Sequence, residues 1–239
     1  MKNKISGKIV ALLLTLIIVA TSGMPLYAKE TGDKANSFRY ENGQSIAKAV
    51  PFSTLSPNAW KKIDGKYYSG DGSVIEGAVA KGIDVSHHQG TVDWKKAKED
   101  GVEFAIIRCG FGMNQTKQDD AQWFNNVKGC EENNIPYGVY LYSYADTVKK
   151  AQSEAEHVLR LIKGHTLAYP VYYDIEEKAV LNKLTAEQLG KIAATFVNKV
   201  KAEGYQTGIY SNKSNFETFL TDSQFSQWNK WVAQYNSAA

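Results

Sequence analysis

The segment at residues 104–109 reads Phe-Ala-Ile-Ile-Arg-Cys, and glycines follow it at positions 110 and 112. A short, nearly continuous apolar run bounded by glycines is typical of a strand that is buried on both faces of a parallel sheet. Stretches with helical periodicity lie before and after it, and this alternation predicts a sheet built from βα units. The segment therefore places the chain in the α/β class.

Outward from this segment, the sequence predicts six strands joined by five helical connections. The strands are expected at residues 82–86, 104–109, 135–144, 167–175, 207–210 and 230–235. The helices are expected at residues 92–100, 119–133, 147–163, 185–203 and 214–220. Thr185 and Gln188 form a capping box at the start of the longest helix, and Gly204 ends it. Six strands are fewer than the eight that close a β/α barrel.

The first 28 residues have the pattern of an export signal. Lysines at positions 2, 4 and 8 precede an apolar run at residues 9–20, and Leu-Tyr-Ala at positions 26–28 offers a cleavage site. This run is shorter than the roughly 20 residues that a permanent membrane helix needs. We therefore predict a signal peptide at residues 1–28, a secreted or cell-wall-associated protein and no permanent membrane span. An uncleaved anchor is the alternative.

Residues 29–80 are predicted to form a linker that ends in a small hairpin. Residues 29–57 are polar and lack a repeating apolar pattern. Residues 58–80 alternate aromatic and polar side chains around two Asp-Gly pairs, which favours a hairpin. This hairpin is similar to one copy of the aromatic repeat of cell-wall-binding modules. The alternative is that it only packs against the domain at residues 81–239.

Composition excludes several classes of protein. The chain of 239 residues is 43% hydrophobic and 22% charged, which is ordinary for a globular protein. It has 28 basic and 25 acidic residues, and three of the lysines fall in the predicted signal, so the remainder is formally neutral. A nucleic-acid partner held by excess positive charge is therefore not expected. Export permits a disulfide between Cys109 and Cys130, and two separate buried thiols are the alternative.

Two carboxylates close the predicted strand at residues 167–175, where residues 172–177 read Tyr-Tyr-Asp-Ile-Glu-Glu. Side chains alternate along a strand, so Asp174 and Glu176 share one face, with Cα atoms about 6–7 Å apart. One ionised carboxylate raises the pKa of its neighbour, and a protonated acid beside an anion is what glycosidic cleavage requires. The alternative is a solvated acidic strand end without catalytic function.

A second polar strand end lies at residues 82–90. Asp84 interrupts a short apolar strand, where burial is costly without a partner, so we expect it to share the pocket with the other carboxylates. His87 and His88 are adjacent and their side chains diverge, which is unfavourable for joint metal coordination. We therefore expect loop-fixing histidines, no metal site and no cofactor.

Aromatic side chains fall on several of the predicted strands. Flat rings with a polar edge line sugar clefts, because they cover the apolar faces of pyranoses and keep a group for the hydroxyls. Core packing is the alternative for part of the set. The aromatic residues predicted to bind substrate are Tyr140, Tyr142, Tyr172, Tyr210, Trp231 and Tyr235. The sequence contains no motif for nucleotide binding, zinc proteolysis, serine hydrolysis or thioredoxin chemistry.

Taken together, in order and spacing, these segments resemble glycoside hydrolase family 25, the muramidase-type lysozymes. The resemblance covers about residues 81–239 and rests on the motifs at residues 82–86, 89–90, 108–112, 136–140, 174–176, 208–211 and 231–235. It implies a modified (β/α) barrel of the glycosidase type. It also implies hydrolysis of the β-1,4 bond between N-acetylmuramic acid and N-acetylglucosamine in peptidoglycan.

The resemblance also assigns functions to individual residues. Glu176 matches the general acid of the family, and Asp174 matches the companion carboxylate that stabilises charge or orients the substrate. Asp84 matches the acid at the end of the first strand, and Arg108 is predicted to bind substrate. The spacing of Asp174 and Glu176 leaves retention and inversion of configuration open.

The C-terminal end departs from the family pattern. Family members continue after the Trp-x-Ala-x-Tyr strand through two more strands that close the barrel and supply another acid, whereas this sequence stops at Ala239. We therefore expect a barrel that lacks its last two strands, in a domain at residues 81–239 that is C-terminally incomplete. Two alternatives to a lysozyme stay open: a catalytically impaired peptidoglycan-binding protein and a chitin-directed glycosidase.

Overall fold

The computed structural model describes residues 40–41, 44–45, 61–69 and 72–233. The predicted signal peptide at residues 1–28, most of the predicted linker and the predicted substrate-binding Tyr235 lie outside the described residues. The predicted α/β domain is described from its first strand to residue 233.

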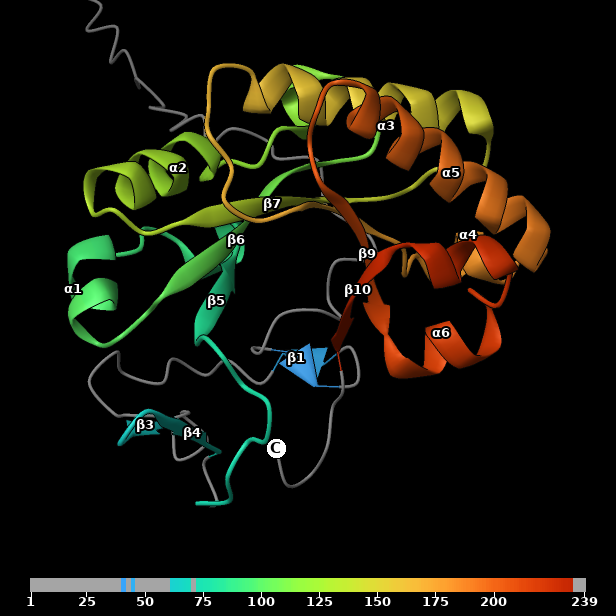
Figure 1. Ribbon diagram of the computed structural model, residues 1–239. Helices are drawn as coiled ribbons and strands as arrows, with labels where there is room; N and C mark the ends of the chain where they lie inside the picture. Colours follow the sequence, from blue (N-terminus) through green and yellow to red (C-terminus); the bar gives the residue numbers. More distant parts are fainter. Residues whose placement is uncertain (1–39, 42–43, 46–60, 70–71, 234–239) are drawn as a thin grey trace, which may run out of the picture.

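Six parallel strands form one sheet in the order β10-β9-β8-β7-β6-β5, so each strand lies beside the one that precedes it in the chain. Their bounds are β5 Gly82–Val85, β6 Phe104–Phe111, β7 Tyr137–Tyr142, β8 Val171–Asp174, β9 Thr207–Asn212 and β10 Asn229–Ala233. Within the described ranges, β5 and β10 are the edges of this sheet, which curls into an open half-barrel (Figure 1). The predicted six-stranded, modified barrel is confirmed.

The helices lie in the connections between these strands. Their bounds are α1 Trp94–Glu99, α2 Trp123–Glu132, α3 Val148–Ile162, α4 Lys178–Leu181, α5 Ala186–Ala202 and α6 Lys213–Thr218. Short 3-10 helices occur at His87–Gln89, Thr116–Gln118 and Ser223–Gln227. Figure 1 shows α2, α3 and α5 along one side of the sheet. In the part of the chain that is described, no helix has the length and apolar character of a membrane span.

The main core lies between the sheet and these helices. Ala105, Ile107 and Cys109 alternate along β6 and are fully buried in this core. On β8, the ring of Tyr173 stacks on Phe196 of α5, with the ring centroids 3.9 Å apart. Because side chains alternate along a strand, the residues between these positions project from the opposite face of the sheet. We call that opposite face the open face.

The two cysteines contribute to the core as free thiols. Cys109 and Cys130 are both buried, and neither forms a disulfide. Burial raises the pKa of both thiols, and that of Cys130 reaches about 12. The structure therefore agrees with the second sequence alternative, two separate buried thiols.

The longest helix, α5, begins and ends at the predicted signals. The Thr185 hydroxyl accepts from the amide of Gln188, and the Gln188 side chain accepts from the amide of Thr185. Gly204 follows with a φ of 88°, the left-handed conformation that commonly ends a helix. The predicted capping box is confirmed.

Two small antiparallel pairs precede the sheet. β1 (Tyr40–Glu41) pairs with β2 (Gln44–Ser45), and β3 (Lys61–Ile63) pairs with β4 (Lys66–Tyr68). Between β3 and β4, residues 64–65 are the Asp-Gly pair and have φ angles of 50° and 78°. Both angles are positive, as the tightest hairpin turns require.

The β3–β4 hairpin is fixed to the main domain through Glu103, the residue before β6. Tyr67 is buried, and its hydroxyl donates to Glu103 Oε2 at 2.5 Å. Lys62 Nζ lies 2.6 Å from Glu103 Oε1, and the amide of Lys81 donates to Glu103 Oε2 at 2.8 Å. The hydrogen bond from Lys62 lowers the pKa of Glu103 to about 2, together with those from Tyr67 and Lys81. One of the hairpin aromatics is therefore used to pack against the domain.

Candidate active site

The sheet aligns one carboxylate and three aromatic residues in a row across the open face. Asp174 ends β8, and it is opposite Tyr142 on β7 and Tyr210 on β9. Tyr210 is in turn opposite Trp231 on β10. Residues opposite each other in a parallel sheet project from the same face, and Tyr173 beside Asp174 belongs to the helix-covered core. The row of Asp174 therefore lies on the open face.

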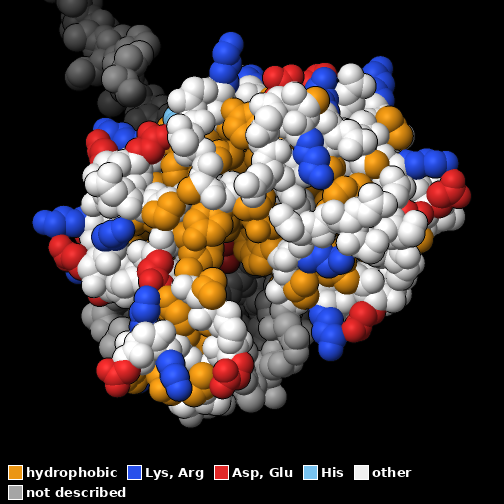
Figure 2. All heavy atoms as spheres, viewed as in Figure 1, with side chains coloured by type: hydrophobic (Ala, Val, Ile, Leu, Met, Phe, Trp, Pro, Cys, Tyr) orange, Lys and Arg blue, Asp and Glu red, His pale blue; other side chains and the backbone are white. Residues whose placement is uncertain are grey.

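Trp231 is the centre of an aromatic cluster on this face. Its ring centroid lies 4.4 Å from that of Tyr210, 5.4 Å from that of Tyr172 and 5.8 Å from that of Tyr140. Three of the predicted substrate-binding tyrosines thus contact one indole, which was itself predicted to bind substrate. Figure 2 shows hydrophobic side chains gathered around a hollow near the middle of the molecule.

The backbone after β8 fixes the direction of Glu176. The amide of Ile175 donates to the carbonyl of Tyr210 at 3.0 Å, and the hydroxyl of Ser211 donates to the carbonyl of Ile175 at 2.7 Å. The side chain of Ile175 belongs to the helix-covered core, so Glu176 projects from the other side of the chain. Asp174 is 0% exposed and Glu176 is 6% exposed. The structure thus places both predicted carboxylates on the open face.

The charges of both carboxylates reach the hydroxyl of Tyr142. Burial raises the pKa of the Tyr142 hydroxyl far above its ordinary value, and the negative charges of Glu176, Asp174 and Glu177 raise it further. The hydroxyl also donates to Glu177 Oε2 at 3.4 Å. Tyr142 therefore keeps its proton and presents a hydrogen-bond donor beside a concentrated negative charge.

Glu177 is a member of this acidic group that the sequence prediction did not include. Its Oε1 accepts from the amide of Ala179 and caps α4. A charged residue at the start of a four-residue helix is a weak sequence signal. The structure adds Glu177 to the acidic group because the Tyr142 hydroxyl donates a hydrogen bond to it.

Asp84 lies on the same face but in a different row. It is opposite Ile106, which is opposite Gly138 on β7, whereas the Asp174 row crosses β7 at Tyr142. Solvent reaches its side chain, yet the surrounding protein still partly desolvates its charge. This desolvation raises the pKa of Asp84 to about 6, although a backbone hydrogen bond acts to lower the pKa. A shared pocket for Asp84 and the other two acids stays a prediction.

Arg108 is held in a buried ion pair. Its side chain is 1% exposed, and Nε donates to Asp120 Oδ2 at 2.8 Å. A second nitrogen of its guanidinium contacts Nδ1 of His87, whose amide donates to Asp120 Oδ2 at 3.1 Å. This cluster ties the loop after β5 to the loop after β6, so His87 is a loop-fixing histidine. Contact between Arg108 and the substrate stays a prediction.

Asp120 was not singled out by the sequence, because it falls within the helix predicted at residues 119–133, whereas α2 begins only at Trp123. Burial opposes its ionisation, but the hydrogen bond from His87, the charge of Arg108 and the amide of Gln122 outweigh this effect. Together they lower the pKa of Asp120 to about 2. Among the described residues, no three His, Cys, Asp or Glu side chains gather as a metal site.

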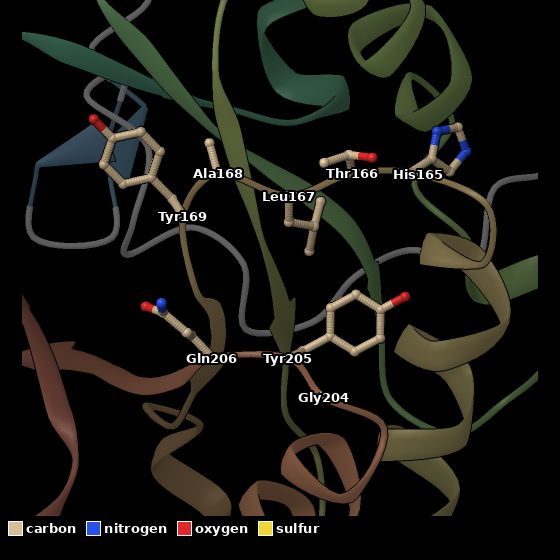
Figure 3. A pocket seen from close by; sticks show the side chains of 8 residues that line it. All are labelled: His165, Thr166, Leu167, Ala168, Tyr169, Gly204, Tyr205 and Gln206. Atoms are coloured by element: carbon tan, nitrogen blue, oxygen red, sulfur yellow. The ribbon is translucent and has the colours of Figure 1, made fainter.

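A cavity of about 340 Å³ lies at the other end of the strands. It is lined by the segment before β8 and the segment before β9, at residues 165–169 and 204–206 (Figure 3). Asp174 lies at the C-terminal end of β8, where α/β barrels place their functional groups. The cavity is therefore separate from the candidate active site.

Comparisons with known proteins agree with this arrangement. Residues 83–239 match the family model described as Glycosyl hydrolases family 25. The autolytic lysozyme of Clostridium acetobutylicum is 28% identical over 155 residues, which are 65% of this chain and 45% of that protein.

Solved structures show the same similarity. The modular autolysin LytC of Streptococcus pneumoniae is 33% identical, with a TM-score of 0.64 over 75% of this chain and 44% of that chain. The same autolysin has been solved in complex with a synthetic peptidoglycan ligand. The lysozyme of Streptomyces coelicolor is 22% identical, with a TM-score of 0.58 over 69% of this chain and 78% of that chain, and shares the fold.

The chain spans less than half the length of the clostridial and pneumococcal proteins. The family match nevertheless covers well over half of this chain and includes all of the six-stranded sheet except its first residue, Gly82. This protein therefore belongs to glycosyl hydrolases family 25.

Proposed function

We propose that this protein is a secreted or cell-wall-associated N-acetylmuramidase, a lysozyme. Its substrate is the β-1,4 bond between N-acetylmuramic acid and N-acetylglucosamine in peptidoglycan. The observation that carries the proposal is the joint placement of Asp174 and Glu176 beside Tyr142. Asp174 and Tyr142 belong to the row that ends at Trp231. The family membership and the peptidoglycan ligand of the pneumococcal autolysin support the choice of substrate.

Each carboxylate has one function in the proposed reaction. Glu176 donates its proton to the glycosidic oxygen while the bond from that oxygen to the anomeric carbon breaks. Asp174 stabilises the positive charge that develops at the anomeric carbon, or orients the substrate group that does so. Water then adds to the anomeric carbon, and its proton returns to Glu176. Asp84, which lies in a different row of the open face, contributes further negative charge opposite the positive charge of the reacting sugar.

The aromatic cluster provides the sugar-binding surface. The rings of Tyr140, Tyr172 and Tyr210 are inclined to that of Trp231 by between 56° and 85°. Rings of this kind cover the apolar faces of pyranoses, and the tyrosine hydroxyls bind the polar edges. Tyr142 adds a donor beside the carboxylates.

Release of reducing sugar from purified peptidoglycan tests the proposal. We expect activity from the wild-type chain and a loss of at least about 100-fold in Glu176→Gln, because an amide cannot supply the proton. Glu203→Gln is the matched control, since Glu203 is exposed at the end of α5. Equal release by wild type and Glu176→Gln would contradict the assigned general acid.

The open sheet supports one alternative in particular, a protein that binds peptidoglycan without cleaving it. Within the described residues, β5 and β10 are unconnected edges, which leaves the open face without a closing strand between them. Such a barrel can grip glycan without cleaving it. Peptidoglycan binding without release of reducing sugar by the wild type would favour this binding protein. Equal product release from chitin oligomers would favour a chitin-directed glycosidase.

A further inference from the structure

Glu154 is a fully buried carboxylate on α3 that the proposed reaction does not use. Its side chain is 0% exposed. Oε2 accepts from the hydroxyl of Tyr173 at 2.5 Å and from that of Ser143 at 2.8 Å, and Oε1 accepts from the amide of Tyr144 at 2.9 Å. Three donors from two neighbouring strand ends therefore converge on one carboxylate.

These donors adjoin the candidate active site in the sequence and in space. Ser143 and Tyr144 directly follow Tyr142, the last residue of β7, and Tyr173 directly precedes Asp174 on β8. The amide of Ser143 also donates to the carbonyl of Asp174 at 2.9 Å. Glu154 thus joins the ends of β7 and β8 from the helix side of the sheet, while Tyr142 and Asp174 face the open side.

Joining two strands through a buried carboxylate costs desolvation free energy. Desolvation raises the pKa of Glu154 to about 7, while Tyr173, the amide of Tyr144, Ser143 and the charge of Lys150 lower it. A short apolar side chain would avoid the desolvation but would leave three donors unsatisfied. Polar networks that are fully satisfied hold a single geometry, which is what a reacting pair needs.

We propose that Glu154 is a positioning residue that fixes the ends of β7 and β8, and thereby holds Tyr142 and Asp174 at a constant separation. It acts through Tyr173 and Ser143 and does not touch the glycan. The effect on turnover rests on the function proposed above. The effect on the strand ends does not depend on that function.

Tyr173→Phe and Glu154→Gln test the proposal. Tyr173→Phe removes one hydroxyl and keeps the ring that stacks on Phe196. We expect kcat to fall about 10-fold in both variants while KM changes less than about 2-fold, because misplacement of reacting groups affects the transition state more than ground-state binding.

Tyr137→Phe is the matched control. Tyr137 begins β7 and is buried, and its hydroxyl donates to Glu131 at 2.8 Å, so the variant removes a comparable bond at the far end of the same strand. We expect it to lower stability and leave kcat unchanged. A fall in kcat equal to that of Tyr173→Phe would mean that loss of stability explains both, and would overturn the proposal.

Hydrogen exchange gives a measurement that needs no turnover. The amide of Ser143 should exchange at least about 10-fold faster in Tyr173→Phe, while that of Val139, which donates to the carbonyl of Pro170, should not change. Unchanged exchange at Ser143 would overturn the positioning function. An inactive wild type with faster exchange at Ser143 in the variant would instead contradict the proposed lysozyme activity and support the positioning.

Discussion

Asp120→Asn should reduce the acid sensitivity of the fold between pH 5 and pH 2 by about 2 kcal/mol. Asp120 and Arg108 are both buried, and the Nε to Oδ2 distance is 2.8 Å. The pKa of Asp120 falls from its ordinary 3.8 to about 2 in the folded protein. A difference of this size corresponds to about 2 kcal/mol of folding free energy.

The direction in which stability changes with pH follows from the lowered pKa of Asp120. A depressed folded pKa gives stability that is complete above the unfolded pKa, near 4, and is lost as the pH falls through about 2. The wild type should therefore lose about 2 kcal/mol more than Asp120→Asn on acidification. At pH 7 the variant should be less stable than the wild type by about 3–5 kcal/mol, because it leaves Arg108 buried without its carboxylate.

Urea unfolding at pH 7, pH 5 and pH 2 measures both effects, with Asp100→Asn as the control at an exposed carboxylate. The reasoning fails if wild type and Asp120→Asn lose the same free energy of unfolding on acidification. It also fails if Asp100→Asn flattens the pH dependence as much as Asp120→Asn does.

Three further variants test other parts of the structure. Gly110→Ala should lower stability by about 1–3 kcal/mol, measured by thermal unfolding, because its Cβ would lie 2.7 Å from the ring of His157. Tyr67→Phe removes the hydroxyl bound to Glu103, so limited proteolysis at residues 61–69 should become faster while the release of reducing sugar is unchanged. Asp84→Asn should remove a loss of stability that occurs in the wild type as the pH rises from about 4 to about 6, since the folded pKa is raised. That loss should be no more than about 1 kcal/mol because solvent reaches the side chain, and equal pH profiles by urea unfolding would contradict it.

The elements of the fold could be predicted because burial and capping leave local signals. The apolar run at residues 104–109 lies within β6, and the capping box at Thr185 begins α5. The predicted boundaries of the elements were less exact where the backbone hydrogen bonds are irregular. The strand predicted at residues 167–175 is shorter, at Val171–Asp174, because the amides of Ala168 and Tyr169 both donate to one carbonyl of β7 and Pro170 has no amide.

The site was predictable in part for a similar reason. Strand alternation places Asp174 and Glu176 on one face, and the structure has both on the open face beside Tyr142. Alternation along a single strand cannot show which aromatic of another strand lies nearby. The central position of Trp231 depends on the register of β10 against β9, which only the folded sheet provides.

The polar networks behind the site could not be predicted. Asp120 meets His87 across 33 positions of sequence, and Glu154 meets Tyr173 across 19. Each network is made of single polar residues on different elements, so no periodicity or spacing marks them. Only the packing of α3 and of the strand-end loops brings these groups together.

Analysis of the new reducing ends in digested peptidoglycan tests the central claim most directly. Purified peptidoglycan is treated with the wild type, Asp174→Asn or Glu176→Gln, and the products are reduced and identified by mass spectrometry. We expect reduced N-acetylmuramic acid from the wild type and almost none from either variant, with all three proteins folded by circular dichroism. Wild-type amounts from both variants, or N-acetylglucosamine at the new reducing ends, would contradict a muramidase that depends on this pair of carboxylates.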